Sequence, residues 1–171
     1  MLRWLKSFFQ VRKRPLDNVS PRVQRLLVLT RKEADRLHQG YVGTEHLLLG
    51  LLELKEGVGY TALMQMKVDV VALKQALDKR VPLGSETEVA RSIPYTPRVK
   101  KVLNLGAAEA DAMNHEYLGT EHVLLGMLRS PGGIAKEVLD NLAVDVVKTR
   151  EEIAKILEAA KGGPNKALPF R

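Results

Sequence analysis

Cysteine is absent from this chain of 171 residues, and aromatic residues make up only 5 % of it. Without cysteine the chain can form neither a disulfide framework nor a thiolate metal site, which is typical of a protein from a reducing compartment. No apolar run approaches the roughly 18 residues that a membrane-spanning helix needs, and the N-terminus lacks the apolar segment and cleavage site of a secretory signal. We therefore expect a cytoplasmic protein with a hydrophobic core, since 45 % of its residues are apolar.

Alternation of apolar and polar residues with a period of two, which marks a half-buried strand, is also missing over any useful length. Apolar residues recur instead with helical spacing, as Val23, Leu27 and Ala34 do. The sequence therefore predicts an all-α fold without a sheet.

Acidic residues are scarce only at the start of the chain. Residues 1–36 hold ten Lys or Arg against three Asp or Glu, which accounts for the whole net charge of +7, and residues 37–171 hold seventeen of each sign. A nucleic-acid-binding face would need basic residues interleaved with aromatic ones, and the later sequence has no such run. We do not expect nucleic acid as a partner.

Residues 1–14, MLRWLKSFFQVRKR, combine large apolar side chains with five basic residues and no acid. This composition fits a basic amphipathic helix on an anionic membrane surface, or a segment that docks into a groove on a partner or on this domain. It fits an unstructured leader equally well. Peripheral membrane association through residues 1–14 is therefore one of three open alternatives.

One phrase of the sequence occurs twice. YVGTEHLLLGLL at 41–52 returns as YLGTEHVLLGML at 117–128, 76 positions later. At this offset, residues 21–52 and 97–128 share seventeen of thirty-two residues without a gap. A match of this length indicates a duplicated structural unit.

The offset continues to VDVV, which occurs at 68–71 and again at 144–147. Proline and glycine punctuate the polar segment between the copies, as in a connecting loop. The predicted organisation is an N-terminal arm (1–19), a first repeat (20–80), a linker (81–95), a second repeat (96–157) and a flexible tail (158–171).

Each repeat is predicted to contain four helices. Ser20 and Thr96 are placed to cap the first helix of their copies, because a proline follows each of them at the first helical position. Thr44 and Thr120 are expected to cap the second helix, each after a glycine that lets the chain turn sharply. The third helices are expected around 61–66 and 136–142, and Asp69 and Asp145 are expected to cap the fourth.

The repeated phrases GTEHLLLGLL and GTEHVLLGML, together with YTPRVKKVL at the start of the second copy, resemble the N-terminal domain of the Clp unfoldases. The resemblance covers about 20–157 and implies two four-helix repeats that pack as a pseudo-twofold pair. In that family the domain sits on an ATP-driven ring and receives substrates or adaptor proteins for the Clp protease.

The chain lacks the G-x-x-x-x-G-K-[ST] loop that would hold the phosphates of ATP. We therefore expect a free-standing, non-catalytic accessory domain, similar to the accessory Clp proteins of plastids and bacteria. Its expected partners are Clp unfoldase or protease subunits, adaptor proteins or substrate proteins.

The resemblance also implies a ligand site in each repeat. In Clp N-terminal domains of Gram-positive type, this glutamate receives the guanidinium of phosphoarginine, a degradation mark, and the matching residues are Glu45 and Glu121. A carboxylate accepts paired hydrogen bonds from a planar cation, and the N–H groups of a helix start suit a phosphate. The expected sites also include four hydroxyls: those of Thr44, Thr120, Ser20 and Thr96.

Lys100 stands four residues after Thr96, where the family places a cation near the phosphate, and the first copy has Gln24 at this position. Lys100 lies in the second copy and is therefore assigned to the site of Glu121. A charge-assisted contact to phosphate is roughly twice as strong as a neutral hydrogen bond. We therefore expect the Glu121 site to bind more tightly.

The same residues have a purely structural explanation. A threonine cap stabilises a helix by about 1 kcal/mol, and a first-turn glutamate adds about 0.3–1 kcal/mol. The domain would then be a structural or regulatory subunit that docks on the Clp protease or chaperone ring. An enzyme of unknown type is a third alternative, but the serines and acids form no nucleophile–base pattern.

His46 and His122 follow the two glutamates and suggest a metal site. However, TEHLLLG does not match H-E-x-x-H, no second histidine lies three or four residues away, and no cysteine completes a zinc set. We expect both to be hydrogen-bonded structural residues, and we expect His38 and His115 to lie at helix ends. The sequence predicts no metal, cofactor or catalytic residue.

Overall fold

The computed structural model describes residues 19–85 and 93–161. Residues 1–18 lie outside these ranges, and with them the segment 1–14, for which membrane association was one of three alternatives. The described residues are helical apart from loops and two isolated backbone bridges, which confirms the all-α fold class. Its helices are α2 (Pro21–Arg36), α3 (Thr44–Leu54), α4 (Val58–Gln65), α5 (Val70–Arg80), α6 (Pro97–Ala112), α7 (Thr120–Arg129), α8 (Ile134–Asn141) and α9 (Val146–Lys161).

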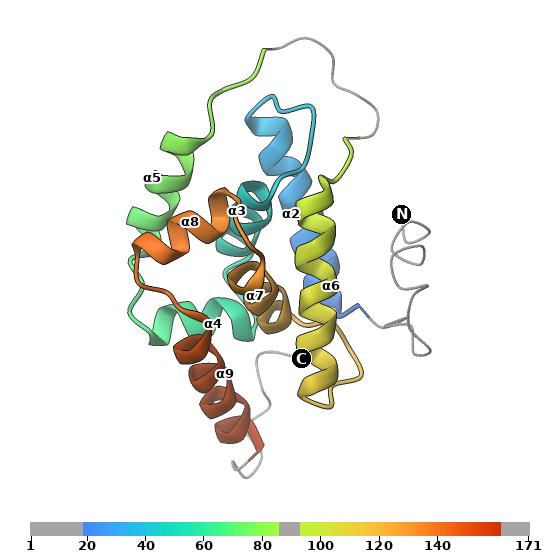
Figure 1. Cartoon of the computed structure of the whole chain (residues 1–171), viewed down its shortest axis with the longest axis vertical. Helices are drawn as coiled ribbons and strands as arrows, with labels where there is room; N and C mark the ends of the chain where they lie inside the picture. The colour runs from blue at the N-terminus through green and yellow to red at the C-terminus, as the bar shows by residue number, and fades with distance from the viewer. Residues whose placement is uncertain (1–18, 86–92, 162–171) are drawn as a thin grey trace.

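The two repeats pack against each other reciprocally (Figure 1). Helix α2 packs on α3 as α6 packs on α7, and α4 contacts α7 and α9 as α8 contacts α3 and α5. The main hydrophobic cluster draws buried side chains from both repeats. The repeats therefore share one core.

None of the described helices is long and apolar enough to cross a membrane.

Backbone hydrogen bonds join the start of each first helix to the other repeat. Ser20 N–H donates to the carbonyl of Leu118 at 3.1 Å, and Thr96 N–H donates to the carbonyl of Val42 at 3.0 Å. Leu118 and Val42 directly precede the two copies of Gly-Thr-Glu-His. The start of α2 therefore lies beside the start of α7, and the start of α6 beside the start of α3.

Four of the predicted helix caps are confirmed. The side chains of Ser20, Thr96, Asp69 and Asp145 each accept a hydrogen bond from a backbone N–H in the following turn, at 2.9–3.3 Å. Side-chain acceptors of this kind satisfy N–H groups that have no partner within the helix.

Several predicted boundaries change. The third helices begin earlier than expected, at Val58 and Ile134, because Gly57 and Gly133 turn the chain with φ angles of 91° and 101°. Helix α9 continues to Lys161, so the first residues of the predicted flexible tail are helical.

The described ends of the predicted linker are packed against the domain. Val81 and Tyr95 are 3 % and 8 % exposed. Gly84 N–H donates to the carbonyl of Leu37 at 2.9 Å. These anchored ends extend the core beyond the repeats that the alignment defines.

The N-cap residues of α3 and α7 are Gly43 and Gly119, and neither helix has a side-chain cap at that position. Thr44 and Thr120 occupy the first helical position, so the prediction that they cap these helices is wrong. Glycine carries no acceptor in its side chain. The N–H groups of these helix starts must therefore find other acceptors.

His46 and His122 supply one of these acceptors in each helix. Gly43 N–H donates to His46 Nδ1 at 2.9 Å, and Gly119 N–H donates to His122 Nδ1 at 2.8 Å. Each ring occupies the third helical position, where a capping box has Glu or Gln. Both rings are fully buried, in the structural role that the sequence predicts.

Burial lowers the pKa of both rings, to about 4 for His46 and about 3 for His122. Desolvation is the main cause, and the positive charge of Arg36 adds to it at His46. The rings are therefore neutral at physiological pH, as an accepting Nδ1 requires.

The second glycine of the repeated phrase permits close helix crossings. A Cβ at Gly50 would lie 2.6 Å from Thr30 Oγ1 and 2.8 Å from the Thr30 backbone nitrogen. A Cβ at Gly126 would meet backbone atoms of Val102 and Gly106. The α2–α3 and α6–α7 pairs can approach this closely only with glycine at these positions.

Replacing Gly50 with alanine should force α2 and α3 apart. Overpacking of this kind typically costs about 1–3 kcal/mol, or roughly 2–12 °C in Tm for a chain of this size. The control is G40A, because a Cβ at Gly40 would meet nothing within 4 Å. Thermal unfolding followed by circular dichroism should separate the two variants, and equal Tm values would contradict the proposed steric role of Gly50.

The substitution H46Q should make stability less sensitive to acid. The unfolded histidine titrates near 6.5 and the folded one near 4, so this contribution to stability is present above pH 6.5 and is lost as the pH falls toward 4. Glutamine at this position can still accept the Gly43 N–H. Between pH 7 and pH 5 the wild type should lose about 2 kcal/mol more than H46Q, measured by urea unfolding.

Other titrating groups contribute to both proteins and cancel in this comparison. A control variant, H38N, changes an exposed histidine and should keep the wild-type dependence on pH. Identical curves for wild type and H46Q would rule out the proposed role of the buried ring.

Candidate ligand-binding sites

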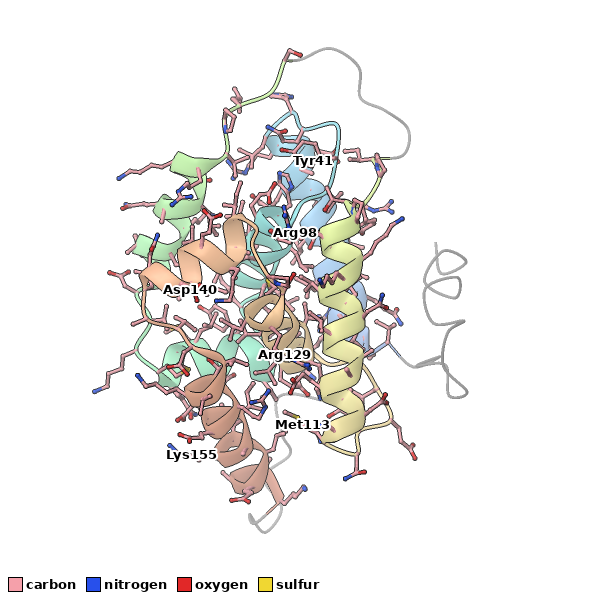
Figure 2. All side chains as sticks on the ribbon, viewed as in Figure 1. Tyr41, Arg98, Met113, Arg129, Asp140 and Lys155 are labelled. Carbon is pink, nitrogen blue, oxygen red and sulfur yellow. The ribbon has the colours of Figure 1, made fainter. Side chains whose placement is uncertain are left out.

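The first predicted site, called here the Glu45 site, combines residues from both repeats. Thr44 and Glu45 lie at the start of α3, and Arg98 lies at the start of α6. A Cβ at Gly133 would lie 2.8 Å from Arg98 Cδ and 3.0 Å from Thr44 Oγ1, so the two side chains meet at this loop. Figure 2 labels Arg98 near the start of α6 and Tyr41 on the loop before α3, at the same end of the domain.

The second predicted site, called here the Glu121 site, has the reciprocal composition. Thr120 and Glu121 lie at the start of α7, and Arg22 lies at the start of α2. Gly59 N–H, in the first turn of α4, donates to Thr120 Oγ1 at 3.1 Å. The charge of Arg22 attracts the Glu121 carboxylate, as that of Arg98 attracts Glu45.

This arrangement corrects the grouping of residues by repeat. Ser20 starts α2, which adjoins the helix start of Glu121. Thr96 and Lys100 belong to α6, whose start adjoins that of Glu45. Lys100 therefore gives no reason for tighter binding at the Glu121 site. That these side chains bind a ligand stays a prediction.

Both glutamate side chains fold back over their helix starts. A Cβ at Gly43 would overlap the carboxylate of Glu45, and a Cβ at Gly119 would overlap that of Glu121. Each carboxylate accepts a hydrogen bond from its own backbone N–H. The first glycine of the repeated phrase thus leaves the space that the carboxylate occupies.

Both carboxylates are buried without a strong cationic partner. Glu45 and Glu121 are 5 % and 3 % exposed. In residues 19–85 and 93–161 the only nitrogens of basic side chains within ion-pair distance are Nδ1 of His46, at 3.7 Å, and Nδ1 of His122, at 3.8 Å. Both rings are neutral, so neither compensates the carboxylate charge.

Burial raises the pKa of Glu45 and of Glu121. Desolvation is the largest cause, and it outweighs the hydrogen bonds and the attraction of the arginine, which favour the ionised form. Keeping such a buried carboxylate ionised costs free energy, and a cation that binds next to it lowers this cost. The chemistry of each site therefore suits a guanidinium, with an arginine nearby for an attached anionic group.

Sequence reasoning missed the neighbour of His122. His115 Nδ1 lies 2.8 Å from His122 Nε2. His115, His122 and Glu121 each offer one potential metal-ligating atom, and these three atoms lie within 4.8 Å of one another. Because His122 Nδ1 accepts the Gly119 N–H, the proton of the neutral ring is on Nε2 and is donated to His115. A metal ion would have to displace this proton, so the set fits a hydrogen-bonded pair better than a metal site.

The first repeat has no such pair. Gln39 holds the position of His115, and its amide donates to the carbonyl of Pro82 at 2.7 Å. His46 Nε2 is buried and has no hydrogen-bond partner among the described residues. The difference between Gln39 and His115 was visible in the sequence, but the contact with His122 required the loop geometry.

Comparison with known proteins places the chain among Clp proteins. A family model described as the Clp repeat (R) N-terminal domain matches residues 18–130 and 94–169. The chain is 40 % identical over 136 residues to the chaperone protein ClpB of Oceanobacillus iheyensis, covering 80 % of this chain and 17 % of that protein. It is 38 % identical over 146 residues to the negative regulator of genetic competence ClpC/MecB of Bacillus subtilis, covering 85 % and 18 %. The chain spans less than a fifth of the length of these two relatives.

Solved structures share the fold at low sequence identity. The N-terminal domain of ClpD from Arabidopsis thaliana matches with a TM-score of 0.63 at 22 % identity, covering 84 % of this chain and 96 % of that one. The Hsp104 N-terminal domain from Candida albicans matches with a TM-score of 0.70 at 11 % identity, covering 82 % and 92 %. Sequence and fold agree, and the chain belongs to the family of Clp repeat N-terminal domains.

Proposed function

We propose that this domain is a non-catalytic receptor that presents substrate or adaptor proteins to a Clp-type ATP-dependent protease, and that it recognises phosphoarginine in marked proteins. The observation that carries the proposal is the pair of buried carboxylates, Glu45 and Glu121, which have no Lys or Arg within ion-pair distance among the described residues. A stability requirement alone would favour a neutral side chain at such positions.

The geometry suits both parts of this ligand. The guanidinium would donate paired hydrogen bonds to the carboxylate, which relieves the cost of its burial. The phosphoryl group would face the arginine contributed by the other repeat, which is Arg98 at the Glu45 site and Arg22 at the Glu121 site. A ligand of this size would therefore contact both repeats at once.

A second candidate is a structural subunit that docks on the Clp ring and binds no such ligand. It is favoured by the hydrogen bond that each carboxylate accepts from its own backbone N–H, because a carboxylate at a helix start can serve as a cap without any ligand. The two functions differ in what they predict for the glutamates.

The double variant E45Q/E121Q should lose affinity for free phosphoarginine. Hydrogen bonds to charged groups contribute about 1.5–3 kcal/mol, so the affinity should fall at least about tenfold. Isothermal titration calorimetry of the full chain measures this directly. The matched control is E151Q, an exposed glutamate on α9, which should bind as the wild type does.

Thermal unfolding of the same variants separates ligand binding from capping. Because burial raises the pKa of both carboxylates, ionised Glu45 and Glu121 reduce stability at pH 7, and glutamine should leave Tm unchanged or higher. Simple capping predicts a loss of about 0.3–1 kcal/mol per site. A lower Tm in the variants, together with no binding by the wild type, would favour the structural subunit.

A further inference from the structure

The surroundings of the two sites differ by one acidic residue. Glu56 lies in the loop between α3 and α4 at the Glu121 site, and the corresponding position in the other repeat, 76 residues later, is Gly132. We infer, on the basis of the proposed function, that phosphorylated ligands bind more tightly at the Glu45 site and that Glu56 weakens their binding at the Glu121 site.

At the Glu121 site the local arginine is already paired. Arg22 Nε lies 3.5 Å from Glu56 Oε2, and Arg25 Nη2 lies 2.9 Å from Glu56 Oε1. The side chain of Arg22 is only 11 % exposed. A phosphate arriving at Arg22 would have to compete with a carboxylate that two cations hold in place, and it would lie near that negative charge.

At the Glu45 site the corresponding arginine is available. Arg98 is exposed and makes no hydrogen bond or ion pair with any residue of the described ranges, and it attracts Glu45 only at longer range. A Cβ at Gly132 would lie 3.7 Å from Arg98 Nη2. The position that corresponds to Glu56 is therefore close to the guanidinium but presents no side chain to it.

The threonine hydroxyls also favour ligand binding at the Glu45 site. Thr120 Oγ1 already accepts the Gly59 N–H, which fixes the first turn of α4 against this site. Ala135 holds the position of Gly59 in the other repeat. Thr44 Oγ1 has one partner among the described residues, Glu45 Oε2 at 3.4 Å. Its lone pairs can therefore still accept a hydrogen bond from a guanidinium.

The effect of one carboxylate is large enough to measure. A unit charge roughly 6 Å from a phosphate, at an effective dielectric constant of about 40, changes the affinity about tenfold. Added salt should reduce the difference, because it screens charges near the surface.

Titration of the full chain with free phosphoarginine tests the inference in variants that keep one site each. E121Q, which keeps the Glu45 site, should bind within about twofold of the wild type, and E45Q should bind at least about tenfold more weakly. Equal affinities in E45Q and E121Q would overturn the inference and leave the proposed function intact. No binding by the wild type would contradict the proposed function, and the inference with it.

Two substitutions test the charges themselves. Adding E56Q to E45Q should increase phosphoarginine affinity about tenfold, because it removes the repelling charge and keeps a polar side chain beside Arg25. Adding R98Q to E121Q should weaken phosphoarginine binding about tenfold. The comparison ligand is arginine amide, which has the guanidinium but no phosphate. Its affinity should stay within about twofold, since only the phosphate needs Arg98.

Both changed side chains lie at the surface or in a loop, and circular dichroism verifies that each variant is folded. E151Q in each background is the matched control and should change neither affinity. A failure of E56Q to improve binding would contradict the proposed repulsion by Glu56, and an equal loss of affinity for both ligands in R98Q would contradict the role of Arg98.

Discussion

The residues at the starts of α3 and α7 are buried between the two repeats, and a buried N–H group needs a hydrogen-bond acceptor. A neutral histidine accepts one of these N–H groups, and the folded-back carboxylate of Glu45 or Glu121 accepts another. The preceding glycine makes room for that carboxylate. The phrase Gly-Thr-Glu-His is therefore a helix start built without an ordinary side-chain cap, and the core helices of both repeats depend on it.

This helix start also creates the chemistry of the site. A carboxylate that satisfies a buried helix N–H without a paired cation is costly in the empty domain and is well placed for a guanidinium. The two copies have since diverged around the same helix start. The copy that contains Glu45 faces Arg98 and Gly132, whereas the copy that contains Glu121 faces the ion pair of Arg22 with Glu56.

Local patterns were sufficient to predict the helices, the duplication and the caps at Ser20 and Thr96, because each depends on neighbours in sequence. Which residues come together at each glutamate could not be predicted in the same way. An alignment of the copies pairs Thr96 with Ser20, but reciprocal packing brings each of them to the glutamate of the other repeat. The prediction that Thr44 caps α3 failed for a related reason. The pattern showed a hydroxyl before an apolar run, but it did not show that the carboxylate of Glu45 and the imidazole of His46 would accept the N–H groups instead.

Binding across the two repeats is tested most directly by following the backbone amide resonances of the full chain in two-dimensional NMR as phosphoarginine is added. We expect the amides of Glu45 and Arg98, which lie in different repeats, to shift together and to saturate at lower ligand concentration than those of Glu121 and Arg22. Shifts that stay within one repeat, or that saturate first at Glu121, would contradict a site shared between the repeats with the Glu45 side as the receptor.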